Sequence, residues 1–268
     1  MLSPKAEQVI RSYFNLPFKG IPGVRAPYFN NTRQRERGQL RVLAGKGTPQ
    51  EIVEEAKIIS IQYHAGLFDK QGDCCLHNSH TGKVVTEDDL RRFLIDHNLG
   101  IDCSGFVTQA LLAHYRETQG INFLKKIIIA PPGKITRRLI AWFRPVENIN
   151  VATYANDANS APIRNTREIK PGDLVIMLKT GPRREHDHIL LITDAQEKTI
   201  HYVHARAWNR EGKYGHGVAR GSIAITKPGG ALLEQTWGEF GLVNEQNETY
   251  LEAKSAETLA LKRLRLTL

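Results

Sequence analysis

The hydrophobic pattern of this chain changes its period once along the sequence. Up to about residue 120, apolar side chains recur at the three- and four-residue spacing of helices, whereas from residue 169 onward they form short β-like runs. Helices that come first and strands that then follow one another are typical of the α+β class, with an antiparallel sheet. We therefore expect an α+β fold with a helical N-terminal region.

Capping signals define three of the expected helices. A Thr-Pro-Gln-Glu segment that begins at Thr48 has the hydroxyl, proline and glutamate of a capping box, and a Thr-Glu-Asp-Asp segment at Thr86 repeats the pattern. Asp102 is placed to cap a third helix, and Gly120 is placed to end it. Together with the apolar spacing, these signals predict helices over residues 49–63, 87–97 and 103–119.

The strands are expected in the second half of the chain. Runs of β-forming residues occupy 173–178, 188–193, 199–206 and 217–226. The segment 194–198 has a suitable length for a hairpin loop between the second and third of these runs. The intervening residues 122–166 are irregular and basic in part, and the sequence predicts no element there.

Composition excludes several classes of protein. The 268 residues include 37 Lys and Arg against 28 Asp and Glu, which gives a net charge of +9, and only three Cys. Three cysteines cannot form a disulfide scaffold in a chain of this length. Basic residues cluster within 25–46, 134–144 and 262–265, but no nucleic-acid motif accompanies them. We therefore interpret these clusters as solvated surface and expect no nucleic-acid partner.

The sequence has no segment typical of a membrane protein. Its longest apolar runs are far shorter than the roughly 18 residues that a membrane-spanning helix needs, so no membrane span is expected. The first residues, Met1 to Glu7, lack the basic and apolar regions of a secretory signal. We therefore expect a cytoplasmic location, with export by a non-classical route as the alternative. The sequence predicts no oligomeric state.

Cys103 is the strongest candidate for a reactive group. It lies at the start of a predicted helix, where unpaired backbone N–H groups and the helix dipole favour a thiolate over a thiol. Ser104 and Gly105 keep the first turn small, so a substrate can approach it. The simpler alternative is a buried structural cysteine, which is the commoner role of a lone Cys.

Histidines on the predicted hairpin are candidate partners for the thiol. A cysteine nucleophile needs a base within hydrogen-bond reach and usually a third group that orients this base. His186 and His188 open one strand, and His201 and His204 lie on the next. Because side chains alternate along a strand, at most one of His201 and His204 can face the same partner as His188. Structural roles for these histidines are the alternative.

Four motifs occur in an informative order. Asp-Cys-Ser-Gly-Phe-Val at 102–107 precedes Ile-Lys-Pro-Gly-Asp-Leu-Val at 169–175, His188 then opens an apolar strand, and Val-His-Ala follows at 203–205. This order resembles the NlpC/P60 family of cysteine peptidases. The resemblance covers about residues 101–206 and identifies the sequence as a divergent member of that papain-like family.

The resemblance implies an activity and a set of site residues. Cys103 would be the nucleophile, His188 the general base and His204 the group that orients His188, while Asp102 and Ser104 would help to bind a substrate amino group. The implied core is papain-like, with the nucleophile helix packed on an antiparallel sheet. The implied reaction is hydrolysis of an amide in a peptide or muropeptide, typically a γ-D-glutamyl link to a diamino acid of the cell wall. No cofactor or metal is expected.

The sequence departs from the family pattern in several places. The usual tyrosine segment shortly before the cysteine is absent, and its nearest analogue is Ala-Pro-Tyr-Phe-Asn-Asn at 26–31, where Tyr28 would contact the oxyanion or the substrate. Leu190 replaces a small residue that usually follows the base. We therefore expect insertions at 32–99 and 122–166. The expected organisation is a helical region over 1–100, in the same domain as a catalytic core over 101–233, and a tail over 234–268.

Other interpretations of the sequence stay open. Two cysteines and two histidines lie together in the segment 74–80, a set of side chains that suits zinc, although their spacing is unlike that of familiar zinc sites. An exposed polar loop and a redox-sensitive thiol pair are the alternatives for this segment. For the whole chain, the alternatives to hydrolysis are a non-catalytic papain-like module that binds an anionic polymer or partner, and a thiol-dependent acyltransferase.

Overall fold

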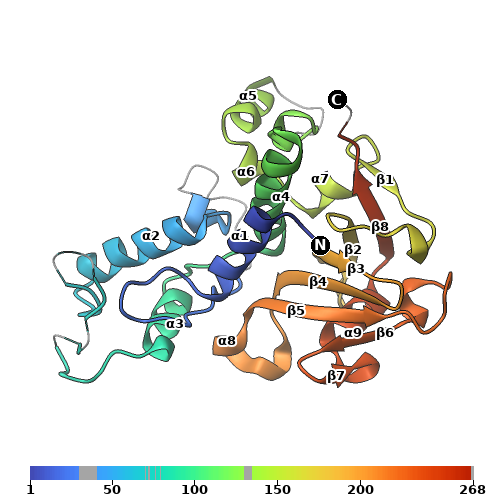
Figure 1. Cartoon of the computed structure of the whole chain (residues 1–268). Helices are drawn as coiled ribbons and strands as arrows, with labels where there is room; N and C mark the ends of the chain where they lie inside the picture. Colours follow the sequence, from blue (N-terminus) through green and yellow to red (C-terminus); the bar gives the residue numbers. More distant parts are fainter. Residues whose placement is uncertain are drawn as a thin grey trace. The chain divides into compact units, whose positions relative to one another are not determined.

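The protein is described here by a computed structural model, which covers residues 1–29, 41–69, 71, 73–75, 77–78, 80–129 and 135–266, with the backbone alone at 135–138 (Figure 1). Several predicted features lie in part outside the described residues. They are the basic cluster 25–46 and the insertion 32–99, both up to residue 40, the residues Asn30 and Asn31 beside Tyr28, Leu76 and Ser79 of the cysteine-rich segment, and Lys134 together with the side chains of 135–138 in the second basic cluster.

The chain divides into two compact units that are each built from separate stretches of sequence. Unit 1 comprises Met1–Glu7, Val107–His204 and Ala219–Leu268. Unit 2 comprises Gln8–Phe106 and Ala205–Val218. The predicted helical region and the predicted catalytic core therefore each contribute residues to both units.

The predicted helices are confirmed. They correspond to α2 (Pro49–Gln62), α3 (Glu87–Asp96) and α4 (Cys103–Gln119). The capping box of α2 is formed in full, because the Thr48 hydroxyl accepts from the Glu51 N–H while the Glu51 carboxylate accepts from the Thr48 N–H. Gly120 follows α4 with φ of +68°, a left-handed conformation that glycine adopts without strain. The capping residues predict these helix ends correctly because each one acts on backbone groups only a few residues away in the sequence.

Eight strands form one antiparallel sheet in the described part of the chain, in the order β1-β8-β2-β3-β4-β5-β6-β7. The α+β class is thereby confirmed. The four predicted runs correspond to β2, β3, β4 and β5, and the predicted hairpin joins β3 to β4. The strand bounds are β1 (Ser160–Pro162), β2 (Leu174–Thr180), β3 (His186–Ala195), β4 (Thr199–Arg206), β5 (Gly217–Ala224), β6 (Thr236–Glu239), β7 (Leu242–Val243) and β8 (Thr258–Leu264).

The segment 234–268 contributes strands near both edges of this sheet, because β6 and β7 end it on one side and β8 is next to the last strand on the other. Its strand β8 lies between β1 and β2, with Leu261 opposite Val175 and Arg263 opposite Ala161. The last apolar stretch of the sequence is thus a strand. The neighbouring helix is α9 (Glu248–Ser255).

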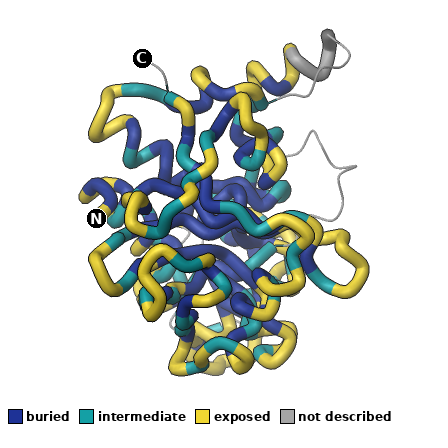
Figure 2. Tube along the Cα trace, turned by 90° about the vertical axis from the view of Figure 1, so that its right-hand side faces the viewer, coloured by how far each residue is buried: buried dark blue, intermediate teal, exposed yellow. Residues whose placement is uncertain are grey.

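One face of the sheet in unit 1 is covered by a continuous apolar core. Val175, Leu190 and Ile192 from adjacent strands are completely buried there, together with Tyr202 and Trp237. Figure 2 shows exposed stretches mainly at turns and loop tips, and buried ones along the strands. Because burial of such side chains stabilises a fold by about 1.5–3 kcal/mol each, this core fixes the strands that hold the histidines.

The irregular segment 122–166 consists of short elements held by tertiary contacts. The largest anchor is Tyr154, which is fully buried and whose hydroxyl lies 2.7 Å from the Thr108 hydroxyl on α4. Elements this short have little stability of their own in water, which explains why the sequence predicts none of them. They are η2 (Phe123–Lys125), α5 (Ile135–Phe143), α6 (Pro145–Asn148), α7 (Val151–Ala155), β1 and η3 (Thr166–Glu168).

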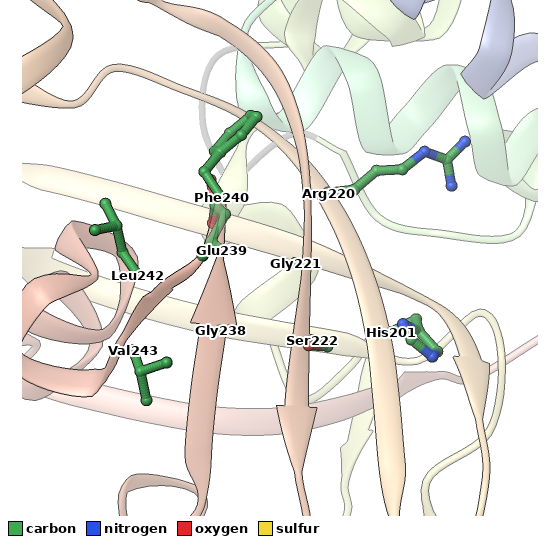
Figure 3. Close-up of a pocket in the computed structure, with 10 residues that line it drawn as sticks. His201, Arg220, Gly221, Ser222, Gly238, Glu239, Phe240, Leu242 and Val243 are labelled. Carbon is green, nitrogen blue, oxygen red and sulfur yellow. The ribbon is translucent and has the colours of Figure 1, made fainter.

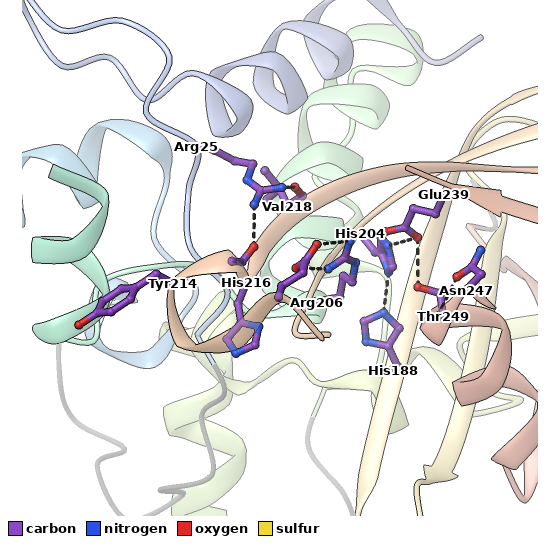
Figure 4. A network of polar contacts seen from close by, with 12 residues as sticks. Arg25, His188, His204, Arg206, Tyr214, His216, Val218, Glu239, Asn247 and Thr249 are labelled. Carbon is purple, nitrogen blue, oxygen red and sulfur yellow. Dashed lines mark hydrogen bonds and ion pairs between the residues drawn. The ribbon is translucent and has the colours of Figure 1, made fainter. Parts of the chain in front are cut away.

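Unit 2 is held together by a buried arginine. Arg91 on α3 donates hydrogen bonds to the carbonyls of Arg25, Tyr214 and His216, which ties the segment 205–218 to the helices of this unit. Figure 4 includes Tyr214 and His216, and shows the bond from Arg25 to the Val218 carbonyl. Burial lowers the pKa of Arg91 to about 10, so the side chain stays charged at neutral pH. The remaining elements are α1 (Pro4–Phe14), η1 (Arg41–Ala44), η4 (Asn209–Glu211), α8 (Gly212–Gly215), η5 (Leu232–Glu234) and η6 (Asn244–Gln246).

Within the residues that the structure describes, no helix is both long enough and apolar enough to cross a membrane.

Candidate active site

Cys103 is the first residue of α4 and is 5% exposed. The residue before it caps the helix as the sequence predicts, because Oδ1 of Asp102 accepts a hydrogen bond from the Gly105 N–H. The other N–H groups of this first turn point out of the helix start, where they favour negative charge. Gly105 permits close packing here, since a Cβ on it would lie 2.4 Å from the Gly45 carbonyl oxygen.

Three chain segments of unit 2 meet at the start of α4. Tyr28 forms a parallel bridge with Ile101, and the Ile101 N–H donates to the Pro27 carbonyl at 3.0 Å. The Asp102 N–H donates to the Gly45 carbonyl at 2.9 Å. Two of the predicted substrate contacts, Tyr28 and Asp102, are thus brought onto one backbone framework. Gly45 has φ of +69°, which a side chain would make strained.

A lysine that sequence reasoning missed lies against this framework. Nζ of Lys46 is 2.8 Å from each carboxylate oxygen of Asp102, and it also donates to the Ser104 hydroxyl. Ser104 in turn donates to Oδ1 of Asp102 at 3.1 Å. The side chains of Lys46 and Asp102 are only 4% and 14% exposed. No local pattern marks Lys46 in the sequence, because it meets Asp102 only through the tertiary fold.

Unit 1 contains the predicted histidine pair. His188 near the start of β3 and His204 on β4 are 4% and 0% exposed, and Nε2 of His188 lies 2.8 Å from Nδ1 of His204 (Figure 4). His201 is exposed, on the other side of β4. The two β4 histidines therefore face opposite sides, as alternation predicts, and the one that contacts His188 is His204, which the family resemblance had named.

Glu239 at the end of β6 completes a hydrogen-bonded relay. Its carboxylate is fully buried and accepts from Nε2 of His204 at 3.2 Å. The same oxygen accepts from the hydroxyls of Tyr202 at 3.2 Å and Thr249 at 3.1 Å. Sequence reasoning missed Glu239, although its alternation with Trp237 places both side chains on one face of a strand.

The carboxylate determines which nitrogen atoms of the relay bear protons. An ionised carboxylate only accepts hydrogen bonds, so with Glu239 ionised Nε2 of His204 bears a proton. Neutral His204 then accepts at Nδ1, and His188 must donate from Nε2. Nδ1 of His188 is consequently the nitrogen with a lone pair, and it can receive a proton in a reaction.

The cysteine-rich segment in unit 2 has a different character. Cys74 and Cys75 are both partly buried thiols. Burial raises the pKa of Cys74 to about 11 and also raises the pKa of Cys75, so both are protonated at neutral pH. Among the residues that the structure describes, no group of three or more His, Cys, Asp or Glu side chains is arranged to hold a metal ion.

A separate hollow of about 410 Å³ lies in unit 1 (Figure 3). It is lined by His201, Arg220 and the tip of the β6–β7 hairpin, including Phe240 and Val243. Glu239 also contributes to the lining, but none of the six predicted site residues does. The candidate chemistry therefore belongs to the Cys103 cluster of unit 2 and to the histidine relay of unit 1.

Neither a protein-family model nor a curated protein matches the sequence.

Proposed function

We propose that this protein is a cysteine-dependent amide hydrolase with a papain-like core. Cys103 is the nucleophile, His188 the general base, and His204 the group that orients His188. The observation that supports the proposal best is the relay from Glu239 through His204 to Nε2 of His188. Such a relay holds an imidazole in one tautomer with a basic nitrogen available, which is what a general base requires.

The proposed reaction has two stages. Nδ1 of His188 takes the proton of the Cys103 thiol, and the sulfur attacks the carbonyl carbon of the amide. The tetrahedral intermediate collapses, the C–N bond breaks, and the amine leaves with the proton from His188. Water then loses a proton to His188 and attacks the resulting thioester. The second collapse releases a carboxylic acid, and the proton returns to the sulfur of Cys103.

The start of α4 suits the charge that develops in this reaction. Backbone N–H groups at a helix start stabilise an oxyanion without having to reorganise during the reaction. Tyr28 is proposed as a further contact to the oxyanion or the substrate, because its backbone is bridged to Ile101 beside the nucleophile.

The proposed substrate is a cell-wall peptide, and the proposed bond is a γ-D-glutamyl link to a diamino acid. Soluble muropeptides in the cytoplasm would give the protein access to this bond. The assignment of the substrate rests on the order of the motifs around Cys103, His188 and His204.

The decisive experiment is incubation of the protein with a mixed muropeptide pool, followed by mass spectrometry of the products. We expect one class of peptide to gain a water and split, and Cys103→Ala to abolish this change. Cys75→Ala is the matched control and should retain the activity. Hydrolysis that survives in Cys103→Ala would refute the mechanism.

The same experiment in ¹⁸O-labelled water separates hydrolysis from the alternatives. Hydrolysis places one label in the new carboxylate, whereas acyl transfer to an added amine gives an unlabelled amide. Binding of a muropeptide without any product would instead indicate a non-catalytic module.

Thiol reactivity tests the proposed base independently of any substrate. Iodoacetamide near neutral pH should alkylate Cys103 selectively, and His188→Ala should remove this selectivity. His201→Ala is the control on the same hairpin. Equal reaction rates at Cys103 and Cys74 in the unmodified protein would count against an activated thiolate.

A further inference from the structure

The carboxylate of Asp102, the residue before the nucleophile, already has a cation of its own. Both of its oxygens lie 2.8 Å from Nζ of Lys46, and Oδ1 also accepts from the Ser104 hydroxyl and the Gly105 N–H. The Lys46 side chain is 4% exposed. The ion pair is therefore an internal part of unit 2 and is largely shielded from solvent.

This pairing changes what the residues beside Cys103 can recognise. A carboxylate next to a nucleophile can bind an ammonium group of a substrate only when its negative charge is not already neutralised. Here the lysine ammonium neutralises Asp102 and also donates to the hydroxyl of Ser104. A substrate ammonium at this position would be repelled by Lys46. The Asp102 carboxylate and the Ser104 hydroxyl, which could accept from it, already accept hydrogen bonds from that lysine.

We propose that Lys46 is a specificity-determining residue that makes the site select amides without an ammonium group next to the scissile bond. The inference rests on the proposed hydrolase function. The preferred substrate is then a peptide whose α-amine is acylated, as in a stem peptide still attached to its sugar acid, rather than one with a free amine. Lys46 acts through Asp102 and is a positioning residue, not a catalytic one.

Alkylation of Cys103 by reagents of different charge tests the electrostatic part of this proposal without any substrate. The ratio of the rate with 2-bromoethylamine, a cation, to the rate with neutral iodoacetamide is measured by mass spectrometry of the Cys103 peptide. Lys46→Met leaves Asp102 without its counter-charge, so the ratio should rise by about tenfold. Lys57→Met removes another lysine charge from the same unit, at a residue paired with Glu54; it is the matched control and should leave the ratio unchanged.

Two further variants keep this test informative if Lys46→Met does not fold. Asp102→Asn retains a good helix cap but leaves the lysine charge unpaired, so the ratio should fall below that of the unmodified protein. Lys46→Arg keeps the charge and should leave the ratio within about twofold of the original value. A ratio that is the same in all folded variants would overturn the proposal.

Turnover tests the substrate class. The unmodified protein should cleave an N-acetylated L-alanyl-γ-D-glutamyl-diaminopimelate with a higher kcat/KM than the same peptide with a free amine. Lys46→Met should shift this preference toward the free amine by about tenfold. A preference of the unmodified protein for the free amine would refute the inference. Failure to cleave either peptide would refute the hydrolase proposal instead, while the alkylation ratio would still report on Lys46.

Discussion

Nε2 of His188 lies 2.8 Å from Nδ1 of His204, and the two rings meet edge to face with an interplanar angle of 70°. This geometry holds the His188 ring through its Nε2 nitrogen. The buried carboxylate of Glu239 then determines the direction in which the relay donates. The histidine pair therefore donates in one fixed direction only because Glu239 on β6 accepts from His204.

Replacement of His204 should impair catalysis more than it impairs folding. In His204→Asn the amide oxygen can still accept from a neighbouring donor, whereas His204→Ala leaves both His188 and Glu239 without this partner. We expect kcat to fall by about 10²–10³-fold in the alanine variant and by less in the asparagine variant. Steady-state kinetics on the cleaved muropeptide measures this difference. His201→Asn, on the exposed side of β4, should change kcat by less than about twofold; a larger change would mean that β4 itself had been disturbed.

Glu239→Gln should weaken the relay without removing it. The amide can still accept from His204, but it has no charge to stabilise the protonated imidazole that forms during the reaction. We expect kcat to fall by about tenfold. Thr249→Val removes only one hydroxyl that Glu239 accepts from, and it should lower kcat much less. Equal losses in the two variants would show that packing around the carboxylate, and not its charge, is what matters.

Alkylation of Cys74 should depend steeply on pH. Burial raises the pKa of this thiol to about 11, so at pH 8 only about 0.1% of it is thiolate, the reactive form. Because a raised pKa leaves less thiolate at every pH below it, the rate with iodoacetamide should rise about tenfold per pH unit from pH 8 to pH 10 and level off above pH 11. Mass spectrometry of the Cys74 peptide follows the rate. A plateau below pH 9 would contradict the burial argument.

Gly221→Ala should displace Tyr202, a hydrogen-bond donor to Glu239 of the relay. A Cβ at this position would lie 2.3 Å from the ring of Tyr202, whose hydroxyl donates to Glu239. We expect a loss of about 1–3 kcal/mol in the free energy of unfolding, measured by urea denaturation, because the fully buried ring has little room to move. Gly238→Ala on the neighbouring strand is the control. Its Cβ would meet only the Ser222 hydroxyl at 3.5 Å, an ordinary contact, so its loss should be smaller.

The parts of the fold that the sequence predicts are those with short-range causes. Helix α4 begins at Cys103 because Asp102 caps it from one residue away, and it ends where Gly120 can turn the chain. The β3–β4 hairpin follows from two apolar runs and a short loop. The alternation of side chains shows that His201 and His204 cannot both face His188, and the order of the motifs names His204 as its partner.

The residues that escaped prediction act across long sequence distances. Lys46 reaches Asp102 from a separate loop, and Glu239 reaches His204 from two strands further along the sheet. Neither contact produces a periodic pattern that could be recognised in the sequence. Tyr154 and the short helices around it are stabilised by burial against α4, which local propensity does not report.

The place of β8 between β1 and β2 has a consequence for how the protein is made. On the ribosome, the strands that bear His188 and His204 are synthesised well before residues 258–264 appear. Until those residues arrive, β2 has an open edge whose backbone N–H and C=O groups can pair with another nascent chain. Completion of the sheet therefore waits for β8, and this edge of β2 stays unpaired until then.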